Sequence, residues 1–388
     1  MRIATFQLRS KLGEVDGNIR RGDDLLAKLE QKLQKGEKKE RLDLLVLPEL
    51  AFTGYNFPSL KAIRPYFENP ESGPSLEWAR SAASRLGSVV GVGYPEIYPS
   101  QSSISSSGSE DGDQDERGFN SLLFVDEEGK SLLNYRKHFL YYTDEPWAHE
   151  GESHQKGQFL FPLSTSRSES RQYLDNRSKL EYRQDLDDPS KSKSEVPIST
   201  STADRDPSRI SATCGICMDI NPYKFITPPS ACEFATLARI NGVKLIILSM
   251  AWLTVLDSEG LAALKGKPDL DTFQYWMSRF RPLLLPHDGD GDGDGDCSST
   301  DQADEQIIIV FANRAGEEEG SEGKDTARYA GSSCVIGIRR SRPPTRELSD
   351  SRGSEAEIVI WDMLGATEEG ICFVDTDSVP RMVGKINI

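Results

Sequence analysis

Two residues of catalytic type stand at the ends of predicted β-strands. Glu49 closes the apolar stretch LLVLPEL, where Pro48 ends the strand and directs the carboxylate away from the sheet edge. Cys217 ends the strand that we predict over residues 210–216. Carboxylates and cysteines are side chains that enzymes use as proton acceptors and nucleophiles. The simpler interpretations, a surface glutamate and a buried structural cysteine, stay open at this point.

A third residue of this kind is Lys137, which lies in the stretch NYRKHFLYY. A lysine inside an apolar strand is rarely buried without a partner. Glu145, eight residues later, offers a carboxylate that could pair with it. The alternative is an edge-strand lysine that deters aggregation.

The stretch ATCGICMDINP contains a Cys-x-x-Cys pair, Cys214 and Cys217, which could be a redox couple, half of a metal site, or one nucleophile beside a bystander. Cys214 lies within the predicted strand, where successive side chains alternate between faces. The two cysteines differ by three positions, so they point to opposite faces, which argues against a disulfide and against shared metal ligation. A zinc site also needs further ligands, and the four histidines show no metal spacing. We therefore expect no metal site.

The elements that must position these residues alternate between strand and helix early in the chain, and strand pairs gather in the middle and at the end. This order predicts an α/β fold in which helices cover the outer faces of two stacked sheets. Helices are predicted over about 17–34, 74–86, 229–241 and 269–281. Strands are predicted over 2–8, 42–47, 88–93, 119–125, 131–136, 210–217, 244–249, 306–311, 330–338, 357–361 and 371–374.

The composition indicates a soluble protein of a reducing compartment. Six cysteines in 388 residues do not form a disulfide framework. No signal or transit peptide is visible, and no apolar run approaches the ~20 residues of a membrane helix. We therefore expect a cytoplasmic location, with the nucleus also open, and no membrane partner.

The acidic net charge of −16 belongs to a few segments of the chain. The full net charge of −16 is the sum over three segments, residues 100–118, 286–306 and 315–325. The rest of the chain is therefore neutral overall. A nucleic-acid-binding protein would show a basic stripe, and the sequence has none, so we expect no nucleic-acid partner.

Low-complexity segments interrupt the regular pattern and are predicted to be disordered loops, because they are too polar to offset the entropy of ordering. One of them contains DGDGDGDGD, which loosely fits a Ca²⁺-binding loop. No amphipathic helices flank this run, so a solvated acidic loop is favoured. The insertions lie at about 100–118, 164–209, 286–306 and 340–355.

Glu49, Lys137 and Cys217 together resemble the Glu–Lys–Cys triad of the nitrilase, or carbon–nitrogen hydrolase, superfamily. The resemblance covers nearly everything except the low-complexity insertions. It implies a single domain over residues 1–388, interrupted by the insertions, with the nitrilase-type four-layer α-β-β-α sandwich. The family-like motifs are Pro48-Glu49-Leu50, Tyr135-Arg-Lys137, Gly215-Ile-Cys217-Met-Asp219, Asn313-Arg314-x-Gly316 and Gly331-Ser-Ser333.

The resemblance also implies a mechanism for amide hydrolysis. The Cys217 thiolate would attack the amide carbonyl, and Glu49 would take the thiol proton, pass it to ammonia and then activate water against the thioester. Lys137 would stabilise the oxyanion with the backbone N–H after Cys217. Glu145 matches a second glutamate of many family amidases and would hold Lys137 and position the substrate. No cofactor is implied.

Within the superfamily, residues 50–57, 136–145 and 217–225 are similar to the fungal protein N-terminal amidases. That branch deamidates N-terminal Asn and Gln of proteins to Asp and Glu and so feeds N-degron proteolysis. Such N-termini are the partners that the resemblance implies. The alternatives are a small-molecule amidase (an ω-amidase or a carbamoyl-amide hydrolase), a nitrilase, an inactive scaffold with acidic interaction loops, and a redox switch.

Three further residues are candidates for substrate binding. Asp219 could receive the α-ammonium group of an N-terminal substrate, although a structural turn aspartate is the favoured interpretation. Tyr55 and Trp252 could line the pocket, or both could simply be core aromatics.

Overall fold

The computed structural model describes residues 1–34, 41–97, 117–163, 208–285, 305–321, 323–340 and 355–387. The four predicted insertions, and with them the possible Ca²⁺-binding loop, lie outside the described residues except at their ends. Residues 1–159 and 212–388 form one unit, and residues 160–211 form a second. All residues of the site described below belong to the first unit.

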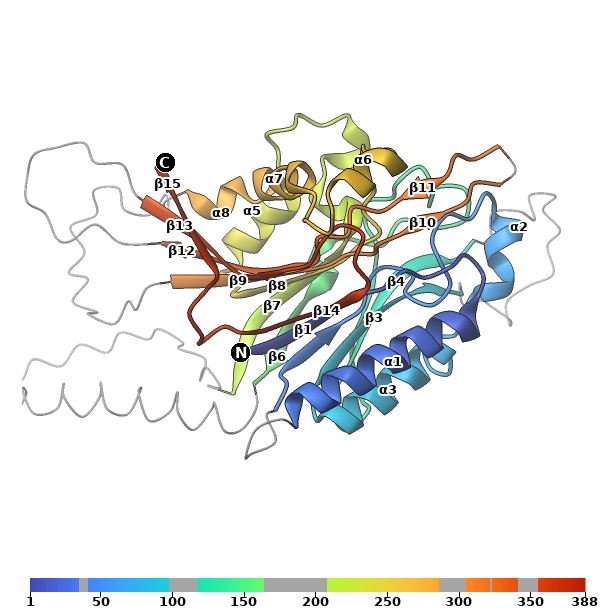
Figure 1. Cartoon of the computed structure of the whole chain (residues 1–388), viewed down its shortest axis with the longest axis horizontal. Coiled ribbons are helices and arrows are strands. Elements are labelled where there is room, and N and C mark those ends of the chain that lie inside the picture. Colours follow the sequence, from blue (N-terminus) through green and yellow to red (C-terminus); the bar gives the residue numbers. More distant parts are fainter. Residues whose placement is uncertain are drawn as a thin grey trace, which may run out of the picture. The chain divides into compact units, whose positions relative to one another are not determined.

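The first of two mixed sheets has the strand order β14-β1-β2-β3-β4-β5 (Figure 1). Strands β1, β2 and β3 are parallel, while β14, β4 and β5 each pair antiparallel with a neighbour. The strands are β1 (Arg2–Gln7), β2 (Leu44–Val46), β3 (Val89–Glu96), β4 (Phe119–Val125), β5 (Ser131–Arg136) and β14 (Gly370–Asp375).

The second sheet has the order β15-β13-β12-β9-β8-β7-β6, in which β7, β8 and β9 are parallel. A two-stranded ribbon of β10 (Glu317–Glu318) and β11 (Ala327–Arg328) is separate from both sheets. The strands of the second sheet are β6 (Gln158–Pro162), β7 (Arg209–Ile216), β8 (Leu245–Ser249), β9 (Glu305–Ala312), β12 (Cys334–Arg340), β13 (Glu355–Met363) and β15 (Met382–Asn387).

Helices cover the outer face of each sheet. On the first sheet, α1 (Val15–Leu33) and α3 (Pro74–Leu86) bury their apolar stripes in one cluster with β1, β2 and β3. The outer face of the second sheet is covered by three helices, α5 (Glu233–Ile240), α7 (Leu270–Arg279) and α8 (Arg281–Leu284). There Trp276 stacks on Phe311 of β9 with ring centroids 5.0 Å apart. This arrangement confirms the predicted α/β fold of four layers.

Shorter elements complete the described chain, and the sequence pattern did not predict them. They are α2 (Leu60–Ile63), α6 (Ser258–Ala263) and the 3₁₀ turns η1 (Arg64–Tyr66), η3 (His154–Gly157), η4 (Cys217–Ile220) and η5 (Tyr223–Phe225). The helix predicted over 269–281 divides into α7 and α8, because Pro282 stands at the start of the second helix. None of the helices in the described ranges has the length and apolarity to span a membrane.

The strand directions bring several loops to one edge. Strand β5 is antiparallel to β4, which is antiparallel to β3, so β5 runs in the same direction as β2. Glu49 and Lys137 therefore follow strands whose carboxyl ends share an edge of the first sheet. Cys217 follows β7 in the second sheet. The hydroxyl of Ser249 donates to the carbonyl of Leu47 at 2.9 Å and joins the strand ends of the two sheets.

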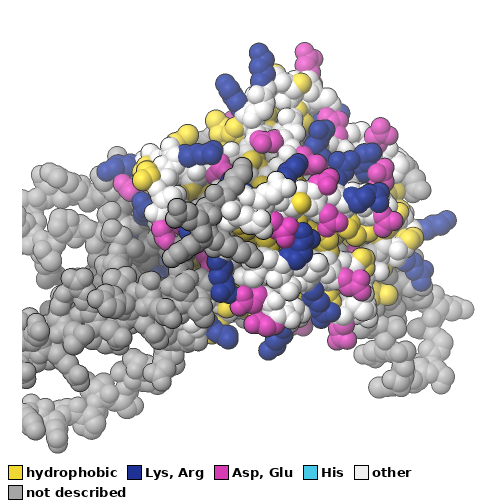
Figure 2. All heavy atoms as spheres, turned by 60° about the horizontal axis from the view of Figure 1, so that its bottom comes forward, with side chains coloured by type: hydrophobic (Ala, Val, Ile, Leu, Met, Phe, Trp, Pro, Cys, Tyr) yellow, Lys and Arg dark blue, Asp and Glu magenta, His cyan; other side chains and the backbone are white. Residues whose placement is uncertain are grey.

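The surface shown in Figure 2 carries charges of both signs. Lys and Arg side chains are interspersed with Asp and Glu side chains over this face, and neither sign occupies a large region alone. On this face, the described part of the chain presents no basic stripe of the kind that binds nucleic acid.

Candidate active site

The Glu49 carboxylate is fully buried at the junction of the two sheets. Its Oε1 accepts hydrogen bonds from Lys137 Nζ (2.6 Å) and Asn120 Nδ2 (2.7 Å), and its Oε2 accepts one from the backbone N–H of Ala251 (2.7 Å). Gly93 of β3 makes this placement possible, because a Cβ there would lie 2.7 Å from the Cα of Glu49. Burial and the negative charge of Asp144 raise the pKa of Glu49, although Lys137 opposes them.

Lys137 lies directly after β5, and its side chain is inaccessible to solvent. Its Nζ donates to Glu49 Oε1 and to Asp144 Oδ2, both at 2.6 Å. An ammonium group has three N–H donors, so one remains for a further acceptor. Burial lowers the pKa of Lys137, but Asp144 and Glu49 outweigh burial and raise it overall, so the side chain is cationic.

The second carboxylate at Lys137 belongs to Asp144, which corrects the predicted role of Glu145. Asp144 is fully buried, and its Oδ2 also accepts from the backbone N–H of Tyr141 at 3.0 Å. Glu145 is exposed and lines a separate cavity of about 420 Å³ together with Glu150 and Lys224. Glu145 therefore does not hold Lys137 in this structure.

Cys217 begins the turn η4 directly after β7. Its φ of 43° is in the left-handed region, which a residue other than glycine adopts only at some cost. Burial and the charge of Glu49 raise the pKa of the Cys217 thiol well above its usual range, although Lys137 and the Ala251 N–H act in the other direction. The thiol is therefore protonated at rest and needs a base. Cys214 is fully buried within β7, and both thiols are free.

Asp219 is a structural anchor and does not line the cavity, which corrects its candidacy for substrate binding. It is fully buried. Burial alone would raise the pKa of Asp219, but His154 and backbone N–H groups lower it, so the carboxylate stays ionised. It ties the loop of Cys217 to the loop of Lys137. Its donors are the N–H groups of Ile216 (2.8 Å), Phe139 (2.8 Å) and His138 (3.1 Å) and the hydroxyl of Tyr135 (2.9 Å).

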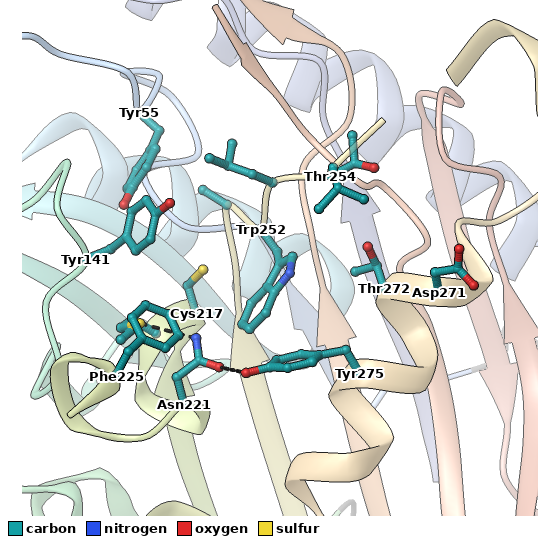
Figure 3. Close-up of a pocket in the computed structure, with 14 residues that line it drawn as sticks. Tyr55, Tyr141, Cys217, Asn221, Phe225, Trp252, Thr254, Asp271, Thr272 and Tyr275 are labelled. Atoms are coloured by element: carbon teal, nitrogen blue, oxygen red, sulfur yellow. Dashed lines mark hydrogen bonds between the residues drawn. The ribbon is translucent and has the colours of Figure 1, made fainter. Parts of the chain in front are cut away.

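A cavity of about 590 Å³ gives access to Cys217 (Figure 3). Tyr55 and Trp252 line it, where the sequence placed them. The hydroxyl of Tyr55 is buried and has no hydrogen-bond partner among the described residues. The other lining residues are Tyr141, Met218, Asn221, Phe225, Ala251, Leu253, Thr254, Val255, Asp271, Thr272 and Tyr275.

This arrangement suits addition of a thiol to a carbonyl group. Cys217 supplies the nucleophile, the buried Glu49 is a carboxylate of raised proton affinity, and Lys137 has one N–H to offer a developing negative charge. In the described ranges, no cluster of His, Cys, Asp and Glu is arranged to hold a metal ion.

Comparisons with known proteins agree with this chemistry. The carbon–nitrogen hydrolase family model matches residues 2–170. The protein N-terminal amidase of Schizosaccharomyces pombe is 29% identical over 385 residues, which cover 96% of this chain and 98% of that protein. The protein N-terminal amidase of Saccharomyces cerevisiae is 30% identical over 253 residues, which are 65% of this chain and 45% of that protein. The chain belongs to the carbon–nitrogen hydrolase superfamily.

Solved structures show the same fold. A crystal structure of an N-terminal amidase with an Asn-Glu-Ala peptide has a TM-score of 0.65 at 22% identity, and the match covers 100% of this chain and 98% of that one. Another, with a Gln-Val peptide, has a TM-score of 0.64 at 22% identity and covers 96% of each chain.

Proposed function

We propose that this carbon–nitrogen hydrolase converts the side-chain amide of N-terminal Asn and Gln in proteins and peptides to the carboxylate. The Cys217 sulfur adds to the amide carbon as Glu49 takes the thiol proton. The tetrahedral intermediate collapses to a thioester when Glu49 passes that proton to the departing ammonia. Water, activated by Glu49, then hydrolyses the thioester and restores the thiol.

The oxyanion of each tetrahedral intermediate needs donors that are already in place. Lys137 meets this requirement with its remaining N–H, because its other two are held by Glu49 and Asp144. The backbone N–H that follows Cys217 is the second donor. We assign the catalytic roles to Glu49, Lys137 and Cys217, and we assign to Asp144 the supporting role beside Lys137 that was predicted for Glu145.

The residues that line the cavity favour one class of substrate over another. Its described residues include no lysine, arginine or histidine. Free asparagine, free glutamine and the usual substrates of ω-amidases bear a carboxylate that a cationic side chain would bind. A peptide N-terminus lacks that carboxylate and bears an α-ammonium, which aromatic faces attract. The aromatic lining residues are Tyr55, Tyr141, Phe225, Trp252 and Tyr275.

The cavity also opens to the surface, as a protein substrate requires. Phe225, Val255 and Tyr275 line it and are 47%, 94% and 40% exposed. A chain that continues beyond its first residue can therefore leave the cavity. The two relatives named protein N-terminal amidase, and the similar folds solved with Asn- and Gln-started peptides, support the same substrate class.

A substrate panel tests the proposal. Ammonia release is measured with Asn- and Gln-started peptides, the same peptides acetylated at the N-terminus, free asparagine and glutamine, and a small nitrile. We expect turnover of the free N-terminal peptides, loss of turnover on acetylation and no activity in Cys217→Ala. Ammonia from the small molecules but not from the peptides would instead identify a small-molecule amidase or nitrilase. No turnover of any substrate would support a scaffold.

A further inference from the structure

Asn120 is one of two adjacent polar residues, with Ser121, in the mainly apolar strand β4, FNSLLFV, and the mechanism above does not use it. It is fully buried. Its Nδ2 donates to Glu49 Oε1 at 2.7 Å and to Asp144 Oδ1 at 3.1 Å, and its backbone carbonyl accepts from the backbone N–H of Lys137 at 2.8 Å. Both hydrogens of the amide are thus used on the two carboxylates.

These contacts close a ring of four side chains. Lys137 joins Glu49 to Asp144 on one side, and Asn120 joins the same two carboxylates on the other. The amide orientation follows from the chemistry, because the opposite orientation would place the Asn120 oxygen against two carboxylate oxygens. The arrangement leaves Asn120 Oδ1 buried and without a partner among the residues that the structure describes. An isolated buried acceptor is unfavourable, so the two donated bonds must outweigh it.

We propose that Asn120 is a positioning residue that holds the Glu49 and Asp144 carboxylates together and thereby keeps Glu49 available as the proton acceptor for Cys217. The inference rests on the proposed mechanism at this site. Two carboxylates that share one lysine repel each other, and repulsion favours uptake of a proton by one of them. A protonated Glu49 could not accept the thiol proton. By donating a hydrogen bond to each carboxylate, Asn120 stabilises the ionised form of Glu49 beside an ionised Asp144.

Other groups around Glu49 also affect its charge, and none of them replaces the amide. Lys137 is the only cation in direct contact with Glu49 in the described residues. The titratable and charged groups that face Glu49 are Lys137 after β5, Asp144 in the following turn, Cys217 after β7, Tyr55 after β2, and Tyr329 after β11.

The test uses the full-length protein with Asn120→Leu, which keeps the size of the side chain but has no donor, and Asn120→Ala. Ser121→Ala is the matched control, because Ser121 is the neighbouring buried residue of β4 and donates to Glu96 at 2.6 Å. The rate of Cys217 alkylation by iodoacetamide is measured against pH without substrate, and peptide mapping confirms the modified residue. Thermal unfolding shows whether each variant folds, and kcat/KM against pH follows with a Gln-started peptide.

Loss of one donated hydrogen bond to the Glu49 carboxylate should move the acid limb of the alkylation profile to higher pH by about one unit. The acid limb of the kcat/KM profile should move in the same direction. Ser121→Ala should leave the acid limbs of both profiles unchanged. A folded Asn120 variant with an unmoved acid limb overturns the inference, whatever its overall rate. Because alkylation needs no substrate, this result is distinct from failure of the peptides to react, which would instead reject the proposed function.

Discussion

Replacing Asp144 with asparagine removes one of the two carboxylates that contact the buried Lys137 ammonium, while the shape of the side chain stays the same. Lys137 Nζ lies 2.6 Å from Asp144 Oδ2, and neither side chain is exposed to solvent. Removing one partner of a buried ion pair typically costs about 3–5 kcal/mol. Because Lys137 keeps its contact with Glu49, we expect the lower end, a loss of about 3 kcal/mol in the free energy of unfolding. If Lys137 also leaves its position as an oxyanion donor, kcat/KM should fall roughly a hundredfold, the usual cost of losing one such donor.

The assay measures ammonia release from a Gln-started peptide over a range of concentrations. Glu145→Gln is the matched control, because it neutralises the adjacent carboxylate, which is exposed and has no contact with Lys137 in the structure. We expect the control to stay within about twofold of the wild type, as surface substitutions usually do. If Glu145→Gln causes the large loss and Asp144→Asn stays near wild type, the assignment of Asp144 is refuted. Thermal unfolding of both variants separates a local effect from misfolding.

Three further predictions concern residues outside the ring of four side chains. Burial raises the pKa of Glu68 from 4.5 to about 7, so folding favours its protonated form, and the stabilisation present below pH 4.5 is lost as pH rises through 7. Urea unfolding should show a decrease of up to about 3 kcal/mol over this window in the wild type, and Glu68→Gln should lack that part of the decrease while the exposed Glu71→Gln retains it. Tyr55→Phe removes a buried hydroxyl without a partner, so the free energy of unfolding should stay the same or rise by about 1 kcal/mol; a clear decrease would show that the hydroxyl has a partner. Cys214→Ser should retain amidase activity, whereas loss of activity with intact folding would favour a dithiol couple.

The strand ends directly before Lys137 and Cys217 were predicted well, because apolar strands that end in Lys or Cys leave a clear pattern. Strands β4 and β5 have the bounds predicted for them, 119–125 and 131–136. Other bounds were less accurate, since β12 begins at Cys334 and not at 330, and β3 continues to Glu96 and not only to 93. Short elements such as α2 and β10 were missed, because two to four residues contain too little periodicity to recognise.

The side chains around Lys137 were harder to predict, for a physical reason. Asp144 and Glu145 are adjacent in an irregular turn, where no helical or strand period fixes which one faces inward. Asn120 carried a usable signal, since a polar Asn-Ser pair within an apolar strand must find partners when buried. The anchoring role of Asp219 depends on contacts with residues 135–139, which are distant in the sequence.

The most direct test of the account is detection of the covalent intermediate on Cys217. The full-length protein is mixed with a Gln-started peptide, quenched in acid during turnover, digested and analysed by mass spectrometry. We predict an adduct on the Cys217 peptide whose mass equals that of the substrate less ammonia, because thioester formation releases ammonia before water enters. The adduct should be absent from Cys217→Ala, which should also release no ammonia. Turnover of the peptide by Cys217→Ala, or an adduct on a different residue, would contradict the account.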